Sequence, residues 1–240
     1  MNVAGHPIRA GVFDMDGVLV DSEPLHHQAL NVVLCHNDRA PLSFDAFRPY
    51  LGASDGFIWD ELVHRQRLPR PVRFYQDQFD EHLIDLYRQQ STVAPGAVKL
   101  LSMLCECGIP LAVASSSRRR WVEACLEAIG VRSYFDVIVD GQMVATAKPD
   151  PAIYLLAAQL LHVEPEECLA VEDSPRGACA AVSAGMLTVA VDTPYTRQNT
   201  AAAAHIHVRS LDELVERVTS SWMSVSMGER CGSLSTIHSS

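Results

Sequence analysis

Short apolar runs that alternate with helical segments constrain the fold of this chain more than any other sequence feature. The apolar runs cover residues 9–13, 110–114, 137–139, 168–171 and 188–191. The helical segments that alternate with them cover residues 119–129, 152–161 and 177–184. Strands that are separated by helices pair in parallel, with helices on both faces of the sheet. The pattern therefore predicts an α/β fold with a Rossmann-like, doubly wound parallel sheet.

A different pattern interrupts this alternation directly after the first strand. Between residues 23 and 92 the strand-like runs disappear, and amphipathic segments such as HHQALNVVL and FYQDQFDEHLIDLYRQQ replace them. We therefore expect a small inserted α-helical cap domain over residues 23–92 and a core built from residues 1–22 and 93–219. An insertion at this point lies over the carboxyl ends of the strands, where open α/β sheets bind ligands. The cap domain is thus a candidate lid.

The end of the chain has a different composition from the rest. After residue 219 the sequence is rich in serine and loses hydrophobic periodicity. Such a segment buries too little apolar surface to offset the entropy of ordering it. We predict a disordered tail over residues 220–240.

The overall charge disfavours two classes of partner. The chain has 29 acidic and 19 basic side chains, and its formal net charge is -10. A negative surface opposes nonspecific binding to nucleic acid or to an anionic membrane. We therefore expect neither partner. A phosphorylated substrate remains possible, because a few local cations, backbone amides or a metal are sufficient to bind it.

Cysteine spacing and the N-terminal sequence help to predict the cellular compartment of the protein. The seven cysteines are scattered and none has C-x-x-C spacing, so the sequence predicts neither a disulfide framework nor a zinc site. The N-terminal sequence lacks the apolar region of a signal peptide, and no stretch has the eighteen uncharged apolar residues of a membrane span. We expect a soluble, cytoplasmic protein, with a monomer as the default state.

Two carboxylates directly follow the first predicted strand. In the motif FDMDG, Asp14 and Asp16 are two residues apart and would project in the same direction from the sheet edge. Asp14 is a candidate nucleophile that attacks phosphorus to form an acyl phosphate. Asp16 is a candidate acid/base, if burial or the neighbouring carboxylate raises its pKa. The alternative is an ordinary Asx turn after a strand.

Candidate phosphate ligands follow the next two strands. Ser115 and Ser116 come directly after residues 110–114, where hydroxyl and helix N-terminal N–H groups can bind phosphate oxygens. Lys148, in the sequence AKPDP, would neutralise both the aspartate and the transferred phosphoryl group. Taken alone, the serines also fit helix caps and the lysine also fits a surface turn.

A second acidic pair follows the strand at 168–171. Mg²⁺ prefers hard oxygen ligands and combines one or two carboxylates with water and substrate phosphate. Asp14 and Asp173 are the carboxylates that we assign to Mg²⁺, with the backbone carbonyl of Asp16 as a third ligand. Glu172 is expected farther from the ion. A helix-capping role for Asp173 is compatible with this assignment.

Together, the four stretches resemble the haloacid dehalogenase-like hydrolase superfamily. The stretches FDMDGVLVDSEP, AKPDP and VEDSPRGACAAVSAGM are similar to the branch that has a helical cap after the first strand and includes β-phosphoglucomutases and sugar-phosphate phosphatases. The resemblance covers roughly residues 9–215. It implies Asp14 as nucleophile, Asp16 as acid/base, Ser115 and Lys148 on phosphate, and Asp173 on Mg²⁺.

The resemblance also implies that the cap determines the phosphoryl acceptor. Mutase-like caps have an arginine just after a glycine-containing loop, which here contains Gly52, and Asp55 stands where that arginine is expected. This difference favours water over a sugar as acceptor. Gly52 and His26 are candidate substrate contacts, and the resemblance implies that His26 couples cap closure to Asp16. A histidine without such a role at a domain boundary is an equal alternative.

Three functions follow, in order of preference. The first is a Mg²⁺-dependent phosphatase that hydrolyses a small phosphorylated metabolite, such as a sugar phosphate, through an aspartyl phosphate. The second is a hexose-phosphate mutase of the β-phosphoglucomutase type. The third is a catalytically idle binding protein that has kept the fold.

Overall fold

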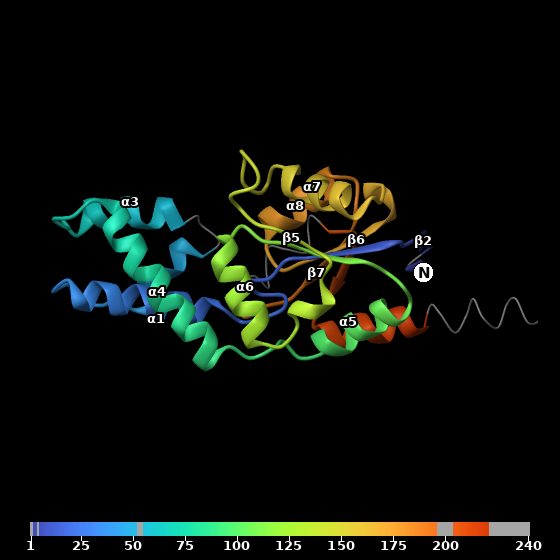
Figure 1. Cartoon of the computed structure of the whole chain (residues 1–240), viewed down its shortest axis with the longest axis horizontal. Coiled ribbons are helices and arrows are strands. Elements are labelled where there is room, and N and C mark those ends of the chain that lie inside the picture. Colours follow the sequence, from blue (N-terminus) through green and yellow to red (C-terminus); the bar gives the residue numbers. More distant parts are fainter. Residues whose placement is uncertain (1, 4, 52–54, 196–203, 221–240) are drawn as a thin grey trace, which may run out of the picture.

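The computed structural model describes residues 2–3, 5–51, 55–195 and 204–220. Its centre is a six-stranded, entirely parallel sheet with the strand order β5-β4-β3-β6-β7-β8 (Figure 1). The strands are β3 (Ala10–Phe13), β4 (Leu111–Ala114), β5 (Val137–Val139), β6 (Cys168–Glu172), β7 (Leu187–Val191) and β8 (Ile206–Val208). The predicted Rossmann-like parallel sheet is therefore confirmed.

The strand order makes β3 the switch point of the sheet. The chain adds β4 and β5 on one side of β3, and then β6, β7 and β8 on the other. Phe13 at the end of β3 lies in register with Val113 of β4 and Val171 of β6. The residues that follow these three strands therefore meet at one edge, where doubly wound sheets form their ligand crevice.

Side chains alternate between the two faces of the sheet, and each face has its own helices. Ala10 and Val12 pack with α7 (Ala152–Leu161) and α8 (Pro175–Ser183). Phe13 belongs to the opposite cluster, with α5 (Ala97–Glu106), α6 (Arg119–Ala128) and a helix over 211–220. Because strand side chains have a period of two, each apolar strand can fill both cores.

The segment after β3 contains only helices among its described residues. They are α1 (Glu23–His36), α2 (Phe44–Phe47), the 3-10 helix η1 (Arg48–Tyr50), α3 (Asp55–Arg65) and α4 (Val72–Gln90). They extend to one side of the sheet (Figure 1). Trp59 and Tyr75 stack with ring centroids 5.8 Å apart inside this group. We call residues 23–92 the helical insertion.

Several short elements were not predicted from the sequence. They are the hairpin of β1 (Asn2–Val3) and β2 (His6–Pro7), the strand β8, and the 3-10 helices η2 (Arg132–Tyr134) and η3 (Pro165–Glu167). Each is only two or three residues long, which is too short for a clear hydrophobic period. β8 pairs in parallel with the edge of β7, with Val189 in register with Ile206.

Two predicted boundaries differ from those in the structure. Helix α8 begins at Pro175 rather than 177, because Ser174 caps it by accepting a hydrogen bond from the Gly177 N–H at 3.1 Å. Ser220 belongs to the helix over 211–220 and not to the predicted tail. Residues 221–240 of that tail lie outside the described residues. No described helix has both the length and the apolar composition needed to cross a bilayer.

Leu104 tests the packing of α5 against the sheet. Its side chain is fully buried, so Leu104→Ala should lower the free energy of unfolding by about 2–5 kcal/mol in urea denaturation. Leu155→Ala is the matched control, because Leu155 on α7 is 42% exposed; it should change the free energy by less than about 1 kcal/mol. Equal effects of the two substitutions would contradict this description of the core.

Candidate active site

A buried lysine lies at the centre of the site. The Lys148 ammonium donates to Asp14 Oδ1 at 2.6 Å, to Glu172 Oε1 at 2.6 Å and to the Ala114 carbonyl at 2.9 Å. Burial lowers the pKa of Lys148, but Asp14 and Glu172 outweigh this effect and raise it above its usual value. The lysine therefore stays charged and joins the ends of β3, β4 and β6.

Glu172 is held from several directions and serves as a fixed support for Lys148. The Tyr154 hydroxyl on α7 donates to Glu172 Oε1 at 2.6 Å. The other carboxylate oxygen of Glu172, Oε2, accepts from the Asp173 N–H at 3.1 Å and from the Ser174 hydroxyl at 3.1 Å. Both carboxylate oxygens thus have protein donors. That Glu172 lies farther from a metal than Asp14 and Asp173 do stays a prediction.

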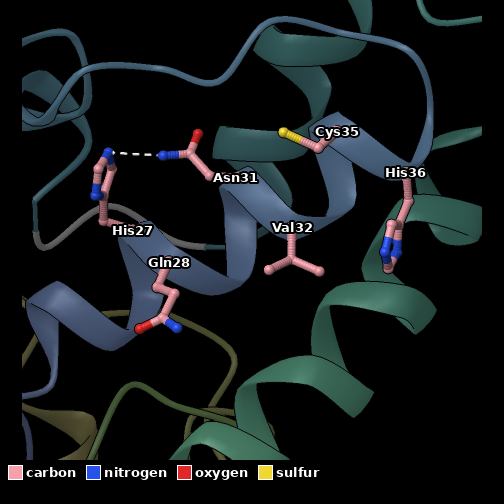
Figure 2. A pocket seen from close by; sticks show the side chains of 6 residues that line it. All are labelled: His27, Gln28, Asn31, Val32, Cys35 and His36. Atoms are coloured by element: carbon pink, nitrogen blue, oxygen red, sulfur yellow. Dashed lines mark hydrogen bonds between the residues drawn. The ribbon is translucent and has the colours of Figure 1, made fainter.

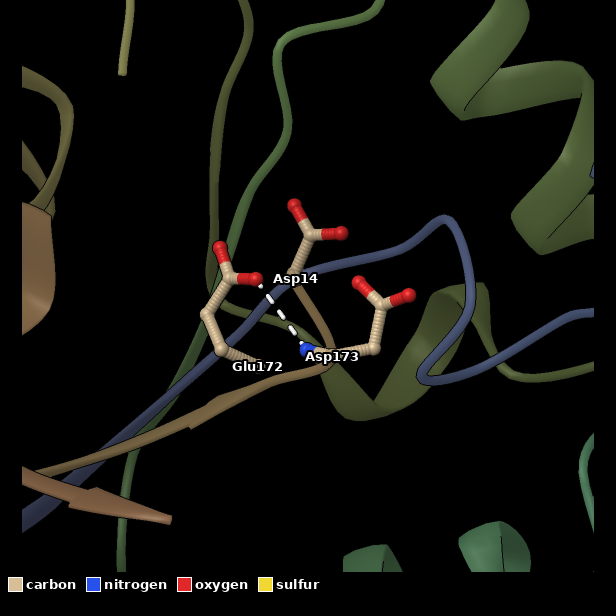
Figure 3. A group of neighbouring side chains, drawn as sticks. All are labelled: Asp14, Glu172 and Asp173. Carbon is tan, nitrogen blue, oxygen red and sulfur yellow. Dashed lines mark hydrogen bonds between the residues drawn. The ribbon is translucent and has the colours of Figure 1, made fainter. Parts of the chain in front are cut away.

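Three carboxylates converge beside this single ammonium group. Ligand atoms of Asp14, Glu172 and Asp173 all lie within 4.8 Å of one another, and Figure 3 shows the three groups on the same side of the strand ends. Burial raises the pKa of Asp14 to about 8, and Lys148 only partly opposes this shift. Burial also raises the pKa of Asp173, and Glu172 and Asp14 raise it further. One lysine does not neutralise three buried carboxylates.

The residues of this cluster therefore fit a divalent cation. Hard carboxylate oxygens suit Mg²⁺, and a bound cation stabilises the ionised form of the acids that face it. Glu172 accepts hydrogen bonds at both of its oxygens, and the assignment of Asp14 and Asp173 to the ion stays a prediction. The Asp16 carboxylate is not part of this cluster. Its predicted role as a ligand concerns the backbone carbonyl and stays a prediction.

Gly17 allows the two acidic motifs to approach each other. It has φ +78°, and a Cβ at this position would overlap the Asp173 carboxylate. A non-glycine residue would therefore be strained in its backbone and would displace a predicted metal ligand. The glycine of the D-x-D-G motif is thus explained by the close packing of β3 against β6 at this edge.

Asp16 is fixed by hydroxyl groups from two directions. Its Oδ1 accepts from Ser22 Oγ at 2.5 Å, and its Oδ2 accepts from Ser117 Oγ at 2.9 Å and from Ser115 Oγ at 3.4 Å. Ser22 and Ser117 were not identified from the sequence. Ser22 directly precedes α1 and Ser117 lies two residues after Ser115, so only the folded chain shows that both face Asp16.

His26 joins Asp16 to the helical insertion. Its Nε2 lies 3.8 Å from Asp16 Oδ1 and 2.9 Å from the hydroxyl of Tyr87 on α4. Burial lowers the pKa of His26, and Asp16 and Asp55 oppose the shift. Tyr87, which is fully buried, was missed by the sequence analysis because nothing in HLIDLY distinguishes it from a core aromatic.

The two serines that were predicted to bind phosphate lie directly after β4. Ser115 is fully buried at the end of β4, and its hydroxyl accepts from the Ser117 N–H at 3.1 Å. Ser116 is exposed on the same loop. Gly52 lies outside the described residues. The assignments of Ser115, Ser116 and Gly52 to phosphate or substrate stay predictions.

A separate pocket of about 420 Å³ lies along α1 and has a different character. Figure 2 shows its lining side chains, which all belong to that one helix: His27, Gln28, Asn31, Val32, Cys35 and His36. His27 Nε2 is already bonded to the Leu42 carbonyl at 2.8 Å and lies 2.9 Å from the Asn31 amide. None of the acids described above lines this pocket, so it is not the candidate active site.

The fold and the site define a class of α/β protein that has carboxylates and a lysine at the carboxyl edge of a parallel sheet. The sequence profile described as haloacid dehalogenase-like hydrolase matches residues 12–191. The chain belongs to this family, and its relatives identify it as an enzyme that hydrolyses phosphoric monoesters.

Curated relatives support this identification. The chain is 32% identical over 179 residues to the phosphorylated carbohydrates phosphatase of Thermotoga maritima, covering 75% of this chain and 82% of the relative. It is 31% identical over 221 residues to the phosphoglycolate phosphatase of Chromobacterium violaceum, covering 87% of this chain and 96% of the relative. These relatives act on small phosphorylated compounds, as their names state.

A solved structure agrees with the fold. CbbY from Rhodobacter sphaeroides, in complex with phosphate, superposes with a TM-score of 0.79 at 32% sequence identity. The match covers 86% of this chain and 96% of CbbY. The resemblance inferred from the sequence motifs is therefore confirmed.

Thermal unfolding tests the metal site without relying on activity. Mg²⁺ at a hundred times its dissociation constant should stabilise the wild type by about 2.7 kcal/mol, or roughly 5–10 °C for a chain of this size. Asp173→Asn should remove this shift without destabilising the metal-free protein, because it relieves repulsion among buried carboxylates. Asp77→Asn, at an exposed position of α4, should keep the shift. A full shift in Asp173→Asn would disprove the assignment.

Proposed function

We propose that this enzyme is a Mg²⁺-dependent phosphatase that transfers the phosphoryl group of a small phosphomonoester to Asp14 and then to water. One observation carries the proposal. The Lys148 ammonium holds Asp14 and Glu172 together at 2.6 Å each, beside Asp173, at the switch point of a parallel sheet. This arrangement offers a fixed carboxylate, a cation and a metal site to one phosphoryl group.

In the first half of the reaction, an oxygen of Asp14 attacks phosphorus and the bond from phosphorus to the ester oxygen breaks. Asp16 donates its proton to the departing alkoxide, which leaves as an alcohol. Lys148 holds Asp14 Oδ1 and so fixes the orientation of the carboxylate for attack. Ser115 and the N–H groups of its loop are proposed to bind the phosphate oxygens.

In the second half, water attacks the phosphorus of the aspartyl phosphate. Asp16, now ionised, accepts a proton from this water, and the bond from phosphorus to the Asp14 oxygen breaks. Inorganic phosphate leaves, Asp14 is again a carboxylate and Asp16 again carries its proton. The hydroxyls of Ser22 and Ser117 keep Asp16 in position, at 2.5 and 2.9 Å from its two oxygens.

Asp14 and Asp173, with the Asp16 backbone carbonyl, are the proposed Mg²⁺ ligands. When bound, Mg²⁺ neutralises charge on the phosphoryl group and keeps the facing carboxylates ionised. This second effect matters for Asp14, whose pKa is raised to about 8 by burial in the metal-free protein. An ionised Asp14 is required because only the carboxylate is nucleophilic.

The helical insertion is the proposed cap domain and lid. It contacts the core through α4 and α6, where Phe79 and Trp121 meet edge to face with ring centroids 5.5 Å apart. A lid at this position would exclude bulk water during phosphoryl transfer. His26 contacts both Tyr87 of the insertion and Asp16 of the core, so it is the proposed link between closure and the acid/base group.

Asp14→Asn tests the covalent mechanism. The amide is not a competent nucleophile, so phosphate release from a panel of sugar phosphates and other small phosphomonoesters should fall by at least about a thousandfold. Asp77→Asn, on the exposed side of α4, should retain wild-type activity. Unchanged release by Asp14→Asn would disprove the aspartyl-phosphate mechanism. A wild type that releases no phosphate from any compound would instead favour the idle binding protein.

The acceptor distinguishes a phosphatase from a hexose-phosphate mutase. The enzyme and Mg²⁺ are incubated with β-glucose 1-phosphate and a trace of the corresponding bisphosphate. We expect free phosphate to accumulate, because Asp55 stands where mutase-like caps are expected to offer a cation. Accumulation of glucose 6-phosphate would show that a sugar hydroxyl competes successfully with water, and the mutase would then be the correct assignment.

A further inference from the structure

Arg118 of the core reaches into the helical insertion and binds carboxylates on two different helices. Its Nη2 donates to Asp55 Oδ2 of α3 at 2.6 Å, and its Nη1 donates to Asp80 Oδ2 of α4 at 2.9 Å. Asp80 is fully buried and also pairs with Arg120. Asp55 Oδ2 accepts a further hydrogen bond from the Gln76 amide at 2.9 Å. The positive charge of Arg118 is thus compensated by carboxylates of the helical insertion.

This ion pair lies next to the acid/base end of the proposed active site. Arg118 directly follows Ser117, whose hydroxyl is 2.9 Å from Asp16. The Arg118 guanidinium lies over the Trp121 ring, 5.4 Å from its centroid, and that ring meets His26 at 5.9 Å. Burial lowers the pKa of His26, and the charges of Asp16 and Asp55 both oppose this shift. A substrate whose phosphate sits at Asp14 and whose other end points toward the helical insertion would pass Asp16 and approach this ion pair.

The two members of the ion pair differ in exposure. Asp55 is largely buried, with 11% of its side chain exposed, whereas 27% of the Arg118 side chain is exposed. Arg118 and Arg120 share the single carboxylate of Asp80, so without Asp55 one of the two positive charges would lack a compensating carboxylate. With Asp55 in place, the two arginines face two carboxylates.

We propose that Asp55 is a specificity-determining residue: by holding Arg118 in an ion pair, it excludes phosphomonoesters with a second anionic group and selects those whose far end is an uncharged polyol or sugar. This inference rests on the proposed phosphatase function. The curated relatives do not indicate whether a charged or an uncharged far end is preferred, because phosphorylated carbohydrates and phosphoglycolate differ in the charge of their far ends. An anionic far end that finds no available cation loses hydration without compensation, so the ion pair disfavours the wrong ligand and gives the right one no extra attraction.

A purely structural role for the ion pair predicts something different. If Asp55 and Arg118 only hold the insertion against the core, breaking the pair should affect all substrates by the same factor. The ratio of kcat/KM between two substrates that differ only in the charge of the far end is therefore the informative measurement. Glucitol 6-phosphate and 6-phosphogluconate form such a pair, with a hydroxymethyl group and a carboxylate at C1.

The wild type should prefer glucitol 6-phosphate over 6-phosphogluconate by at least about tenfold in kcat/KM. Asp55→Asn keeps the shape of the side chain and removes its charge, so it should reduce this preference by at least about tenfold. Adding Arg118→Gln to Asp55→Asn should restore the wild-type preference, because the exposed cation is then gone. Asp60→Asn, at an exposed position of the same helix, should keep the wild-type preference.

An equal effect of Asp55→Asn on both substrates, or a wild type that treats them alike, would overturn the inference and leave the phosphatase function intact. A wild type that hydrolyses neither of them, nor any other phosphomonoester, would instead overturn the proposed function.

A measurement on the wild type alone covers the case in which Asp55→Asn does not fold. Salt screens exposed charges, with a Debye length of about 10 Å at 0.1 M and about 3 Å at 1 M. Because the ion pair leaves no available cation for the carboxylate of 6-phosphogluconate, raising the ionic strength over this range should not lower kcat/KM for 6-phosphogluconate relative to glucitol 6-phosphate. A ratio that falls as salt is added would show that a cation attracts the far carboxylate and would overturn the inference.

Discussion

The rest of the site depends on one buried ammonium group, that of Lys148. A charge in the interior is tolerated only when partners surround it, and here the partners are Asp14, Glu172 and the Ala114 carbonyl. These partners come from three neighbouring strands, so a single side chain links their ends. Tyr154 supports the arrangement from the helix layer through Glu172. Lys148 is thus both an electrostatic element of the proposed chemistry and a structural tie between β3, β4 and β6.

The same interaction leaves an excess of negative charge, and that excess indicates a cation. Asp14 and Asp173 are buried near Glu172, and their pKa values are raised by burial against only partial help from Lys148. Gly17 keeps the acidic motifs in close contact, because any larger residue would overlap Asp173. The folded chain therefore maintains a repulsive arrangement that a divalent ion would relieve. Such strain is typical of sites whose function requires a bound group.

The core and the helical insertion have separate roles in this description. The groups proposed to react with the phosphoryl group all follow strands of the core, where backbone register fixes them. Selectivity is assigned to the contact between the two parts, where Arg118 meets Asp55 and Asp80. A change in the insertion can then alter the substrate without disturbing Lys148 and its partners.

The sequence by itself determined the parallel sheet and the strand-end positions of Asp14, Ser115 and Asp173, because apolar periodicity and turn chemistry are local properties. It did not reveal β8, which forms only against the edge of β7. Nor did it reveal Ser117 and Tyr87 beside Asp16 and His26, because their partners are distant in sequence: Ser117 Oγ and Asp16 are 101 positions apart. The ion pair of Asp55 with Arg118 was equally hidden, since a charged residue on an amphipathic helix normally faces water. Only the tertiary structure decided these contacts, by bringing the helical insertion onto the end of the sheet.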